Sequence, residues 1–295
     1  MHCKVIKQYF LNQSPLYCLR SKKKLANILF VSFDKLIALT STNELYLERE
    51  RFDKKKKKNL HIKEPKPALK RIHKRIKILL ERIKIPNFIY SPKKGCSCVN
   101  NAKLHIDNNV LRKLDIRSYF SSISSRRVYW FFNKRMKCSK DVAGILTKLL
   151  TFKGCLPTGS PSSPIISYYA HIDMWESISK IAMEANCSLS VWLDDITVSG
   201  KTVPTQVIWR IKKAIKRSGL SYHKEKYYAG KKPREVTGSV IVNGRLLAPK
   251  RQHLKRKHLL LRIDRQQNLN SEALTLKLSL NGLEAHIQQI ESHNR

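Results

Sequence analysis

Three aspartates stand at positions from which a β-sheet could bring their carboxylates together. Asp194 and Asp195 are adjacent, and they separate two short runs rich in β-branched and aromatic residues, 189–193 and 196–199. This pattern predicts a β-hairpin with the acidic pair at its turn. Asp115 ends a strand that is predicted from a buried apolar run. Adjacent carboxylates repel each other unless a cation lies between them, and Mg²⁺ binds one or two carboxylates while leaving room for substrate phosphates.

Carboxylates supplied from separated segments are what a two-metal phosphoryl-transfer site requires. One ion lowers the pKa of an attacking hydroxyl and the other stabilises the leaving pyrophosphate; the ions lie ~3.5–4 Å apart, so at least two carboxylates must converge. Phe120 follows Asp115 by five positions and could face the sugar of an incoming nucleotide. The alternative is structural, because an Asp-Asp pair is also a favourable polar turn and Asp115 would then merely end a strand.

The 295-residue chain carries a large excess of positive charge. It has 59 Lys and Arg against 21 Asp and Glu, a formal net charge of +38, and 42% of its residues are hydrophobic. The hydrophobic content supports a sizeable core in one large or two ordinary domains. The charge favours a polyanionic partner, with nucleic acid ahead of an anionic membrane. No apolar run approaches the ~18 residues that would span a bilayer, so we expect no membrane association.

The amino terminus lacks the apolar core of a signal peptide, so we expect a cytoplasmic protein. Seven cysteines are scattered along the chain, and Cys96 and Cys98 are the only close pair. No second pair stands at zinc-finger spacing, which favours reduced thiols over a metal site. The run of five lysines at 54–58 fits either a solvated loop or phosphate contacts that do not read sequence.

Apolar spacing and turn residues place the remaining elements around the aspartates. The glycine- and proline-rich loop 154–164 is predicted to open one long helix from Ser163 to about Glu184. Two short helices are predicted within 14–50, the second reaching Leu47. The other predicted helices cover 68–83, 126–135, 142–152, 206–218, 252–265 and 273–290, and the predicted strands cover 110–116, 222–228 and 239–243.

Taken in order, several blocks of the sequence resemble bacterial reverse transcriptases of the retron type. The first catalytic block of that family resembles 114–123, the loop that packs on template and nucleotide resembles 156–164, and the catalytic hairpin resembles 192–200. An Asn-Ala-x-x-His segment at 101–105 and a Val-Thr-Gly segment at 236–238 resemble retron enzymes more than reverse transcriptases in general. The combination of these blocks is far more specific than any one of them.

The resemblance covers roughly residues 14 to 290 and implies an α+β fold of the right-hand polymerase type. Such a fold has fingers, a palm built on an antiparallel sheet, and a small helical thumb. The N-terminal helices and fingers would occupy residues 1–108. The palm, with the catalytic site and interleaved fingers elements, would occupy 109–243, and the thumb 244–295.

The function that the resemblance implies is RNA-directed DNA synthesis with two Mg²⁺ ions and dNTP substrates. The enzyme would copy part of a cognate structured non-coding RNA into single-stranded DNA, primed from the 2′-hydroxyl of a guanosine in that RNA. Its partners would be this RNA, the DNA product and an effector protein in anti-phage defence. Two alternatives stay open: a catalytically weak RNA-binding scaffold, and an intron-encoded reverse transcriptase, which the lack of a maturase or nuclease extension disfavours.

The resemblance also assigns roles in catalysis and nucleotide binding. Asp115, Asp194 and Asp195 would bind the metal ions, and Lys226 would lie near the leaving pyrophosphate, where a protonated amine can act as a general acid. Three further residues would form the nucleotide site: Phe120 as the steric gate against ribonucleotides, Gly159 behind the nucleotide, and Thr158 where the family usually has Gln.

RNA contacts are expected from the two retron-like segments and from the thumb. The residues concerned are Asn101, His105, Val236, Thr237, Gly238, Arg251, Lys255 and Arg256. Asn101 and His105 could instead tie a loop together by hydrogen bonds, and Val236-Thr237-Gly238 could be a packing turn.

The sequence also departs from the family pattern in the hairpin and in the fingers. Trp192 and Leu193 replace the usual Tyr-Ala and, being larger, are expected to press on the primer end or shift the hairpin. The family's basic residue in the fingers is not assigned, and Lys57 or Lys58 could take its place.

Overall fold

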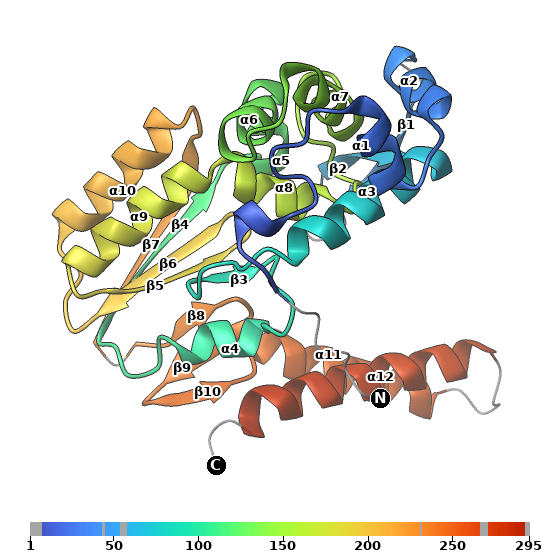
Figure 1. Ribbon diagram of the computed structural model, residues 1–295. Helices are drawn as coiled ribbons and strands as arrows, with labels where there is room; N and C mark the ends of the chain where they lie inside the picture. Colours follow the sequence, from blue (N-terminus) through green and yellow to red (C-terminus); the bar gives the residue numbers. More distant parts are fainter. Residues whose placement is uncertain (1–7, 43–44, 54–57, 231, 266–270, 293–295) are drawn as a thin grey trace.

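A five-stranded sheet carries the predicted catalytic segments, and helices cover one of its faces (Figure 1). The computed structural model describes residues 8–42, 45–53, 58–230, 232–265 and 271–292. Neighbouring strands are antiparallel, except that β3 runs parallel to β5. The order across the sheet is β3 (Ile89–Ser91), β5 (Ser188–Trp192), β6 (Asp195–Gly200), β4 (Val110–Ile116) and β7 (Tyr222–Ala229).

One face of this sheet packs into the main hydrophobic core, and the opposite face carries the carboxylates. Because successive side chains on a strand point to opposite faces, Leu114 and Ile196 enter the main core while Asp115 and Asp195 face the other way. The main core is completed by apolar stripes of α9 (Ile172–Glu184) and α10 (Thr205–Arg217). The sheet therefore separates the carboxylates from the α9–α10 layer.

Most of the remaining helices pack together beyond one end of the five-stranded sheet (Figure 1). The amphipathic helix predicted over 68–83 is confirmed as α3 (Pro67–Glu81), with proline at its first position and a buried apolar stripe. Around it lie η1 (Leu11–Gln13), α1 (Lys22–Leu29), α2 (Phe33–Ser41), α5 (Tyr119–Ser122), α6 (Ser125–Trp130), η2 (Phe131–Arg135), α7 (Lys140–Leu150) and α8 (Ser163–Ala170).

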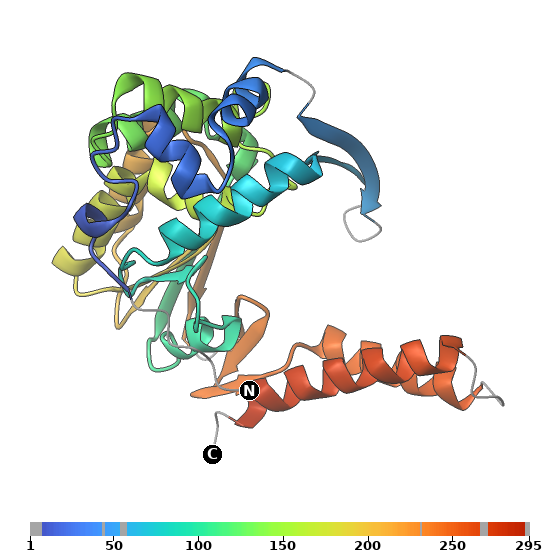
Figure 2. The ribbon, with the colours of Figure 1, turned by 45° about the vertical axis from the view of Figure 1, so that its right-hand side comes forward.

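A two-stranded hairpin projects from this helical part, on the same side as the C-terminal helices (Figure 2). It consists of β1 (Tyr46–Asp53) and β2 (Lys58–Pro65), which pair antiparallel over eight residues. The prediction that the second N-terminal helix reaches Leu47 was wrong, because Leu47 pairs with Glu64 in this ladder. Of the lysine run, 54–57 lie outside the described residues, so the expected basic residue of the fingers stays unassigned.

A second, smaller core joins the palm to the C-terminal helices. It gathers Leu111 of β4, Val99 of α4 (Cys98–Lys103) and Ile287 of α12 (Ser271–Glu291). The three-stranded sheet in this core has the order β10-β9-β8. Its strands are β8 (Arg234–Val236), β9 (Ser239–Val242) and β10 (Arg245–Leu247), and α11 (Lys250–Asp264) follows. The predicted boundary at 243/244 falls in the turn between β9 and β10, so we propose that the thumb begins with α11.

The long helix predicted from Ser163 to Glu184 is two helices. The backbone of His171 leaves the helical region at φ −125° and ψ 30°, so α8 ends and α9 begins there. Apolar residues keep helical spacing across this break, which is why the sequence pattern does not show it. The helix predicted over 126–135 also changes, because its second half is the π-helix η2.

Two findings complete the fold. All cysteines within the described ranges are free thiols. Across the same ranges, no helix is long and apolar enough to cross a membrane.

Candidate active site

The sheet register brings the separated aspartates together. Asp115 is the direct cross-strand neighbour of Asp195 on one side and of Lys224 on the other. Asp194 occupies the turn before β6, and its carbonyl oxygen accepts a hydrogen bond from the Ile116 amide at 2.9 Å. All three aspartates line one pocket of about 500 Å³. The predicted convergence of three aspartates from two separated segments is therefore present in the structure.

The hairpin that carries the acidic pair has a tight, strained turn. Trp192 pairs with Asp195, which leaves only Leu193 and Asp194 to reverse the chain. Leu193 has a φ of 56°, in the left-handed region, which residues other than glycine rarely adopt. A non-glycine residue held there costs about 1–3 kcal/mol, and such strain is concentrated at functional sites. The turn is thus built to hold the carboxylates in place at a cost in stability.

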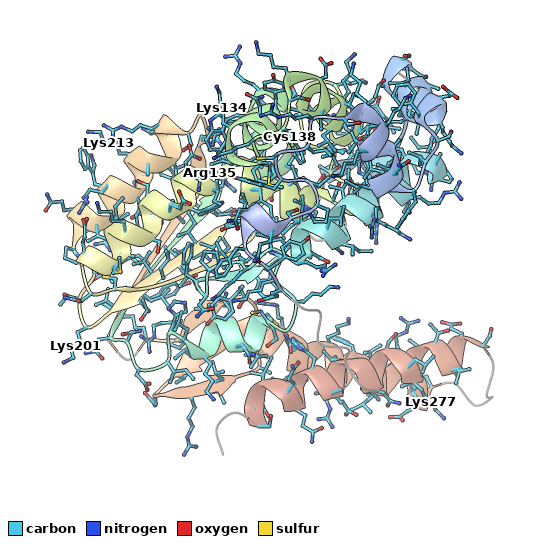
Figure 3. The ribbon with its side chains drawn as sticks, viewed as in Figure 1. Lys134, Arg135, Cys138, Lys201, Lys213 and Lys277 are labelled. Atoms are coloured by element: carbon cyan, nitrogen blue, oxygen red, sulfur yellow. The ribbon has the colours of Figure 1, made fainter. Side chains whose placement is uncertain are left out.

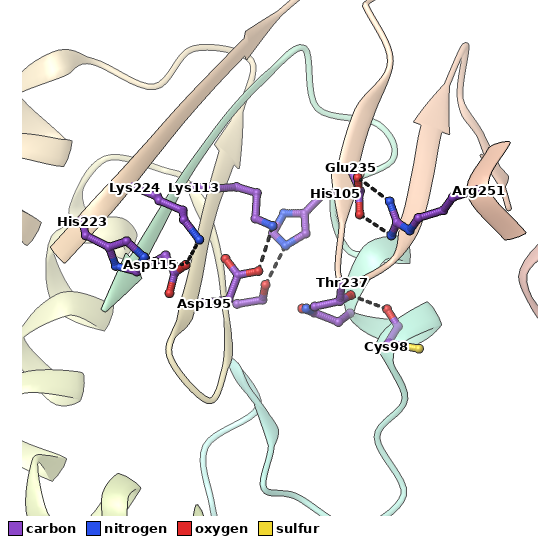
Figure 4. Close-up of polar contacts among 12 residues, drawn as sticks. Cys98, His105, Lys113, Asp115, Asp195, His223, Lys224, Glu235, Thr237 and Arg251 are labelled. Atoms are coloured by element: carbon purple, nitrogen blue, oxygen red, sulfur yellow. Dashed lines mark hydrogen bonds and ion pairs between the residues drawn. The ribbon is translucent and has the colours of Figure 1, made fainter. Parts of the chain in front are cut away.

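Cationic side chains surround the two cross-strand carboxylates (Figure 4). Lys113 Nζ lies 2.8 Å from Asp195 Oδ2, and Lys224 Nζ lies 3.4 Å from Asp115 Oδ2. His223 Nε2 is 3.6 Å from the same Asp115 oxygen. The sequence pattern did not single out these two lysines or this histidine. Lys113 could have been found, because it precedes Asp115 by two positions on a predicted strand and so shares its face.

The pKa of Asp195 is raised, and burial is the main cause. Burial raises the pKa of Asp195, Lys113 lowers it, and the neighbouring Asp115 carboxylate raises it again. Lys226 also lowers the pKa of Asp195, from its position opposite Lys113 on β7. Lys226 lines the same pocket, where the resemblance places the lysine near the leaving pyrophosphate.

The donor set fits a hard divalent cation that shares its coordination with substrate. Within the described ranges, no three His, Cys, Asp or Glu side chains stand close enough together to form a complete metal site. Mg²⁺ does not need one, since it commonly takes one or two carboxylates and completes its shell with water and substrate phosphates. Asp115 and Asp195 supply two facing carboxylates, and Asp194 supplies a third at the rim of the same pocket.

The two retron-like segments meet at the wall of this pocket. Asn101 Nδ2 donates to Thr237 Oγ1 at 3.3 Å, and Thr237 Oγ1 donates to the carbonyl oxygen of Cys98 at 2.7 Å. Cys98 and Thr237 both line the pocket, together with Trp192. Thr237 and Gly238 have φ values of 43° and 89°, so the turn between β8 and β9 bends tightly. Segments about 130 positions apart thereby form one wall.

His105 supports the hairpin from within the core. Its ring is fully buried, with Nδ1 2.6 Å from Ser199 Oγ and Nε2 2.8 Å from Ser190 Oγ. Burial lowers the pKa of His105 to about 3, so the ring is neutral at physiological pH. Asn101 and Val236 are also buried. For these three residues the geometry favours the structural alternative over direct RNA contact.

Thr158 and Gly159 fasten the projecting hairpin to the palm. The Thr158 hydroxyl donates to the carbonyl oxygen of His61 at 3.0 Å and accepts from the amide of Lys63 at 3.3 Å. The Gly159 amide donates to the carbonyl oxygen of Lys63 at 3.0 Å. Thr158 therefore makes backbone contacts of its own at the position where the family usually has glutamine.

Replacing Gly159 by alanine is expected to loosen this attachment. A Cβ at this position would lie 2.8 Å from the backbone oxygen of Lys63, which cannot move without shifting β2. We expect a loss of about 1–3 kcal/mol of stability, typical of overpacking, and weaker dNTP binding. Urea unfolding and the KM for dTTP measure the two effects. Gly144→Ala is the matched control, because a Cβ there meets no atom within 4 Å. Equal KM values for the two variants would contradict the prediction.

The three thumb residues that are expected to contact RNA differ in whether they already form ion pairs within the protein. Arg251 donates to both carboxylate oxygens of Glu235, at 2.6 and 3.1 Å, and Arg256 Nε donates to Glu284 at 2.6 Å. Lys255 is exposed and takes part in no ion pair with any described residue. A phosphate would compete with glutamates for the two arginines, whereas Lys255 is available.

Comparison with known proteins identifies the class. The family described as "Reverse transcriptase (RNA-dependent DNA polymerase)" matches residues 53–241. The chain therefore belongs to the reverse transcriptase family, and the predicted α+β right-hand polymerase fold is confirmed.

Its relatives narrow the class. The chain is 33% identical over 146 residues to the Retron Se72 reverse transcriptase of Salmonella heidelberg, covering 49% of this chain and 38% of the relative. It is 26% identical over 167 residues to the Retron Ec86 reverse transcriptase of Escherichia coli, covering 55% and 52%. These matches confirm the resemblance to retron-type enzymes, over about half or less of each relative's length.

Among solved structures, the chain is similar to a foamy viral protease-reverse transcriptase in complex with double-stranded DNA. The TM-score is 0.47 at 13% sequence identity, over 81% of this chain and 37% of the other.

Proposed function

We propose that this protein is a cytoplasmic retron reverse transcriptase, which copies part of a cognate structured RNA into single-stranded DNA. The observation that carries the proposal is the direct pairing of Asp115 with Asp195 beside the strained turn of Asp194. Membership of the reverse transcriptase family and the retron relatives support the choice of template and product. Priming from a guanosine 2′-hydroxyl and a role in anti-phage defence with an effector protein belong to the same proposal.

The residues of the pocket divide the work of nucleotidyl transfer. Asp115, Asp194 and Asp195 would hold two Mg²⁺ ions, which when bound supply Lewis-acid stabilisation of the attacking and leaving oxygens. Lys226 would act as the general acid toward the leaving pyrophosphate. Lys113 and Lys224 neutralise the carboxylates while the pocket is free of substrate, at 2.8 and 3.4 Å.

The product itself tests the proposal. The gene would be expressed with its flanking DNA, and small nucleic acids would be extracted and treated with ribonuclease. We expect a discrete single-stranded DNA that is absent when Asp194 and Asp195 are both replaced by asparagine. Sequencing the DNA would identify its template. If no such DNA forms although the protein binds RNA, the RNA-binding scaffold becomes the better assignment.

Phe120 is proposed to exclude ribonucleotides. It lies on α5, directly after the strand that ends with Asp115 and Ile116, and its ring packs 5.7 Å from that of Tyr119. Phe120→Ala would open space beside the sugar, and we expect the preference for dNTPs over rNTPs to fall by about tenfold or more. Single-nucleotide incorporation with dTTP and UTP measures this ratio. Phe30→Ala, at an exposed aromatic residue between α1 and α2, is the control. An unchanged ratio in Phe120→Ala would remove this residue from the gate.

A further inference from the structure

Helix α10 presents an unusual outer face. Trp209, Lys213, Lys216 and Arg217 are all exposed, and their spacing places them along one side of the helix. Trp209 is 56% exposed, and Lys213 Nζ lies 4.7 Å from the centre of its ring. Helix α10 contains no acidic residue at all. We refer to these four residues as the α10 ridge.

Hollows lie on both sides of the α10 ridge. One of about 910 Å³ runs between α10 and α9 and is bordered by Lys180 of α9 and Arg126 of α6. The other, of about 490 Å³, is bordered by Tyr222 at the start of β7. Trp209, Lys213 and Arg217 line both hollows. The ridge is therefore flanked by concave surfaces wide enough for nucleotides.

Folding accounts for these side chains only in part: Lys216 and Arg217 lie in the last turn of α10, where cations favour the helix dipole, and Lys213 lies over the Trp209 ring. The acids in this region are already used, because Asp173 pairs with Arg127, Glu184 with Arg210, and Glu225 with Lys212. In contrast, Lys213, Lys216 and Arg217 form no ion pair with any residue that the structure describes. Like charges four residues apart, such as Lys213 and Arg217, destabilise a helix. A basic cluster without acidic partners around an exposed tryptophan points to an anionic ligand.

The α10 ridge is separate from the catalytic pocket. Helix α10 covers the sheet face that carries Leu114 and Ile196, whereas Asp115 and Asp195 lie on the opposite face. Lys213 lies at the outer edge of the molecule on this side (Figure 3). A nucleic acid on the ridge would therefore lie outside the path of a primer and template held over the carboxylates.

We propose that the α10 ridge is a second RNA-binding surface, which holds a part of the structured RNA that is not being copied. The cations would contact backbone phosphates, and an unpaired base would stack on Trp209, as in proteins that bind single-stranded RNA. An acidic protein would also meet the cations, but an aromatic ring set among them matches a base flanked by phosphates better. The inference rests on the proposed function, since it assumes a structured RNA partner.

A charge-matched pair of triple variants tests this surface. The first is Lys213→Glu/Lys216→Glu/Arg217→Glu on the α10 ridge. The second is Lys23→Glu/Lys24→Glu/Lys35→Glu on α1 and α2, where all three lysines are exposed. Binding of a fluorescein-labelled RNA stem-loop with a single-stranded tail is followed by anisotropy at several salt concentrations. We expect the α10 variant to bind about tenfold or more weakly and its log–log salt slope to fall by about 2–3. The α1–α2 variant should change far less.

Trp209 tests the stacking part independently. Trp209→Ala should weaken binding of the tailed stem-loop by roughly fivefold or more, whereas Trp209→Phe should retain most of the affinity. Equal loss in the two charge variants would mean that net charge alone drives binding, and wild-type affinity in the α10 variant would leave the ridge to an acidic protein. Either result overturns the inference. Extension of oligo(dT) on poly(rA) by the wild-type protein is measured alongside, because its absence would refute the proposed function rather than the ridge.

Discussion

Replacing Asp194 and Asp195 together by asparagine is expected to lower DNA synthesis by about three orders of magnitude. The reason is electrostatic: neutral amides cannot hold the cations that stabilise the attacking and leaving oxygens, a contribution of several kcal/mol. The fold should survive, since asparagine has nearly the same shape and the change removes repulsion between Asp195 and Asp115. Extension of oligo(dT) on poly(rA) at saturating Mg²⁺ and dTTP measures the effect.

RNA affinity separates this prediction from a general loss of structure. We expect the double variant to bind an RNA stem-loop as tightly as the wild type or slightly more tightly, because negative charge has been removed near the nucleic acid. Asp107→Asn, an acidic residue outside the pocket, is the matched control and should retain synthesis. If the double variant still extends the primer at a rate within tenfold of the wild type, the three aspartates are not the catalytic centre.

The second large effect is acid instability, caused by three buried histidines. Burial lowers the pKa of His73 and His171 to about 4 and that of His105 to about 3. His73 is enclosed between Ser160 Oγ at 2.5 Å and the carbonyl oxygen of Leu149 at 2.7 Å. At pH 5 the unfolded chain protonates all three rings, whereas the folded protein keeps them neutral.

The sign of the pH dependence follows directly. Stability from these histidines is fully present above the unfolded pKa of about 6.5 and is lost as the pH falls towards the folded values. Each ring costs roughly 2 kcal/mol between pH 7.5 and 5, so the three together cost about 6 kcal/mol, comparable with the whole stability of many proteins. Urea unfolding at pH 7.5, 6.0 and 5.0 measures this slope.

Single variants show whether these histidines are responsible. His73→Gln should lower the free energy of unfolding at pH 7.5. It should also reduce the dependence of that free energy on pH, because one proton fewer is taken up on unfolding. His171→Gln serves the same purpose if His73→Gln does not fold. His258→Gln, at an exposed position on α11, is the control for the general effect of replacing a histidine. A free energy of unfolding that stays constant from pH 7.5 to 5.0 would contradict the prediction.

The sequence was most informative where local pattern and tertiary role coincide. Val110–Ile116 and the two arms of the acidic hairpin alternate or cluster apolar residues as sheet strands do, and all three are strands of the central sheet. The family resemblance placed Asp115 near the hairpin although 79 positions separate it from Asp194. The register in which β4 pairs with β6 makes Asp115 and Asp195 direct neighbours, and no local sequence pattern could specify that register.

What the sequence could not show are contacts between distant polar groups. Asn101 and Thr237 are 136 positions apart, and nothing in either segment indicates that one donates to the other. His73 lies on the apolar stripe of α3, and its presence there is explained by partners from distant segments, Ser160 and the carbonyl oxygen of Leu149. The β1–β2 hairpin was missed because its strands alternate charged residues instead of presenting a hydrophobic face.

The way in which α11 and α12 are anchored determines how they can move when nucleic acid presses against them. Among the described residues, the hydrophobic cluster between α11 and α12 has three buried members: Leu259, Leu276 and Leu280. The last turns of α12, with Ile287 and Ile290, are instead clamped into the core shared with α4 and the small sheet. Because few apolar contacts hold the rest of the pair, we expect it to be rigid at this base and more flexible along its length. We therefore expect a growing duplex to displace the far end of this helical pair while its base stays fixed in the second core.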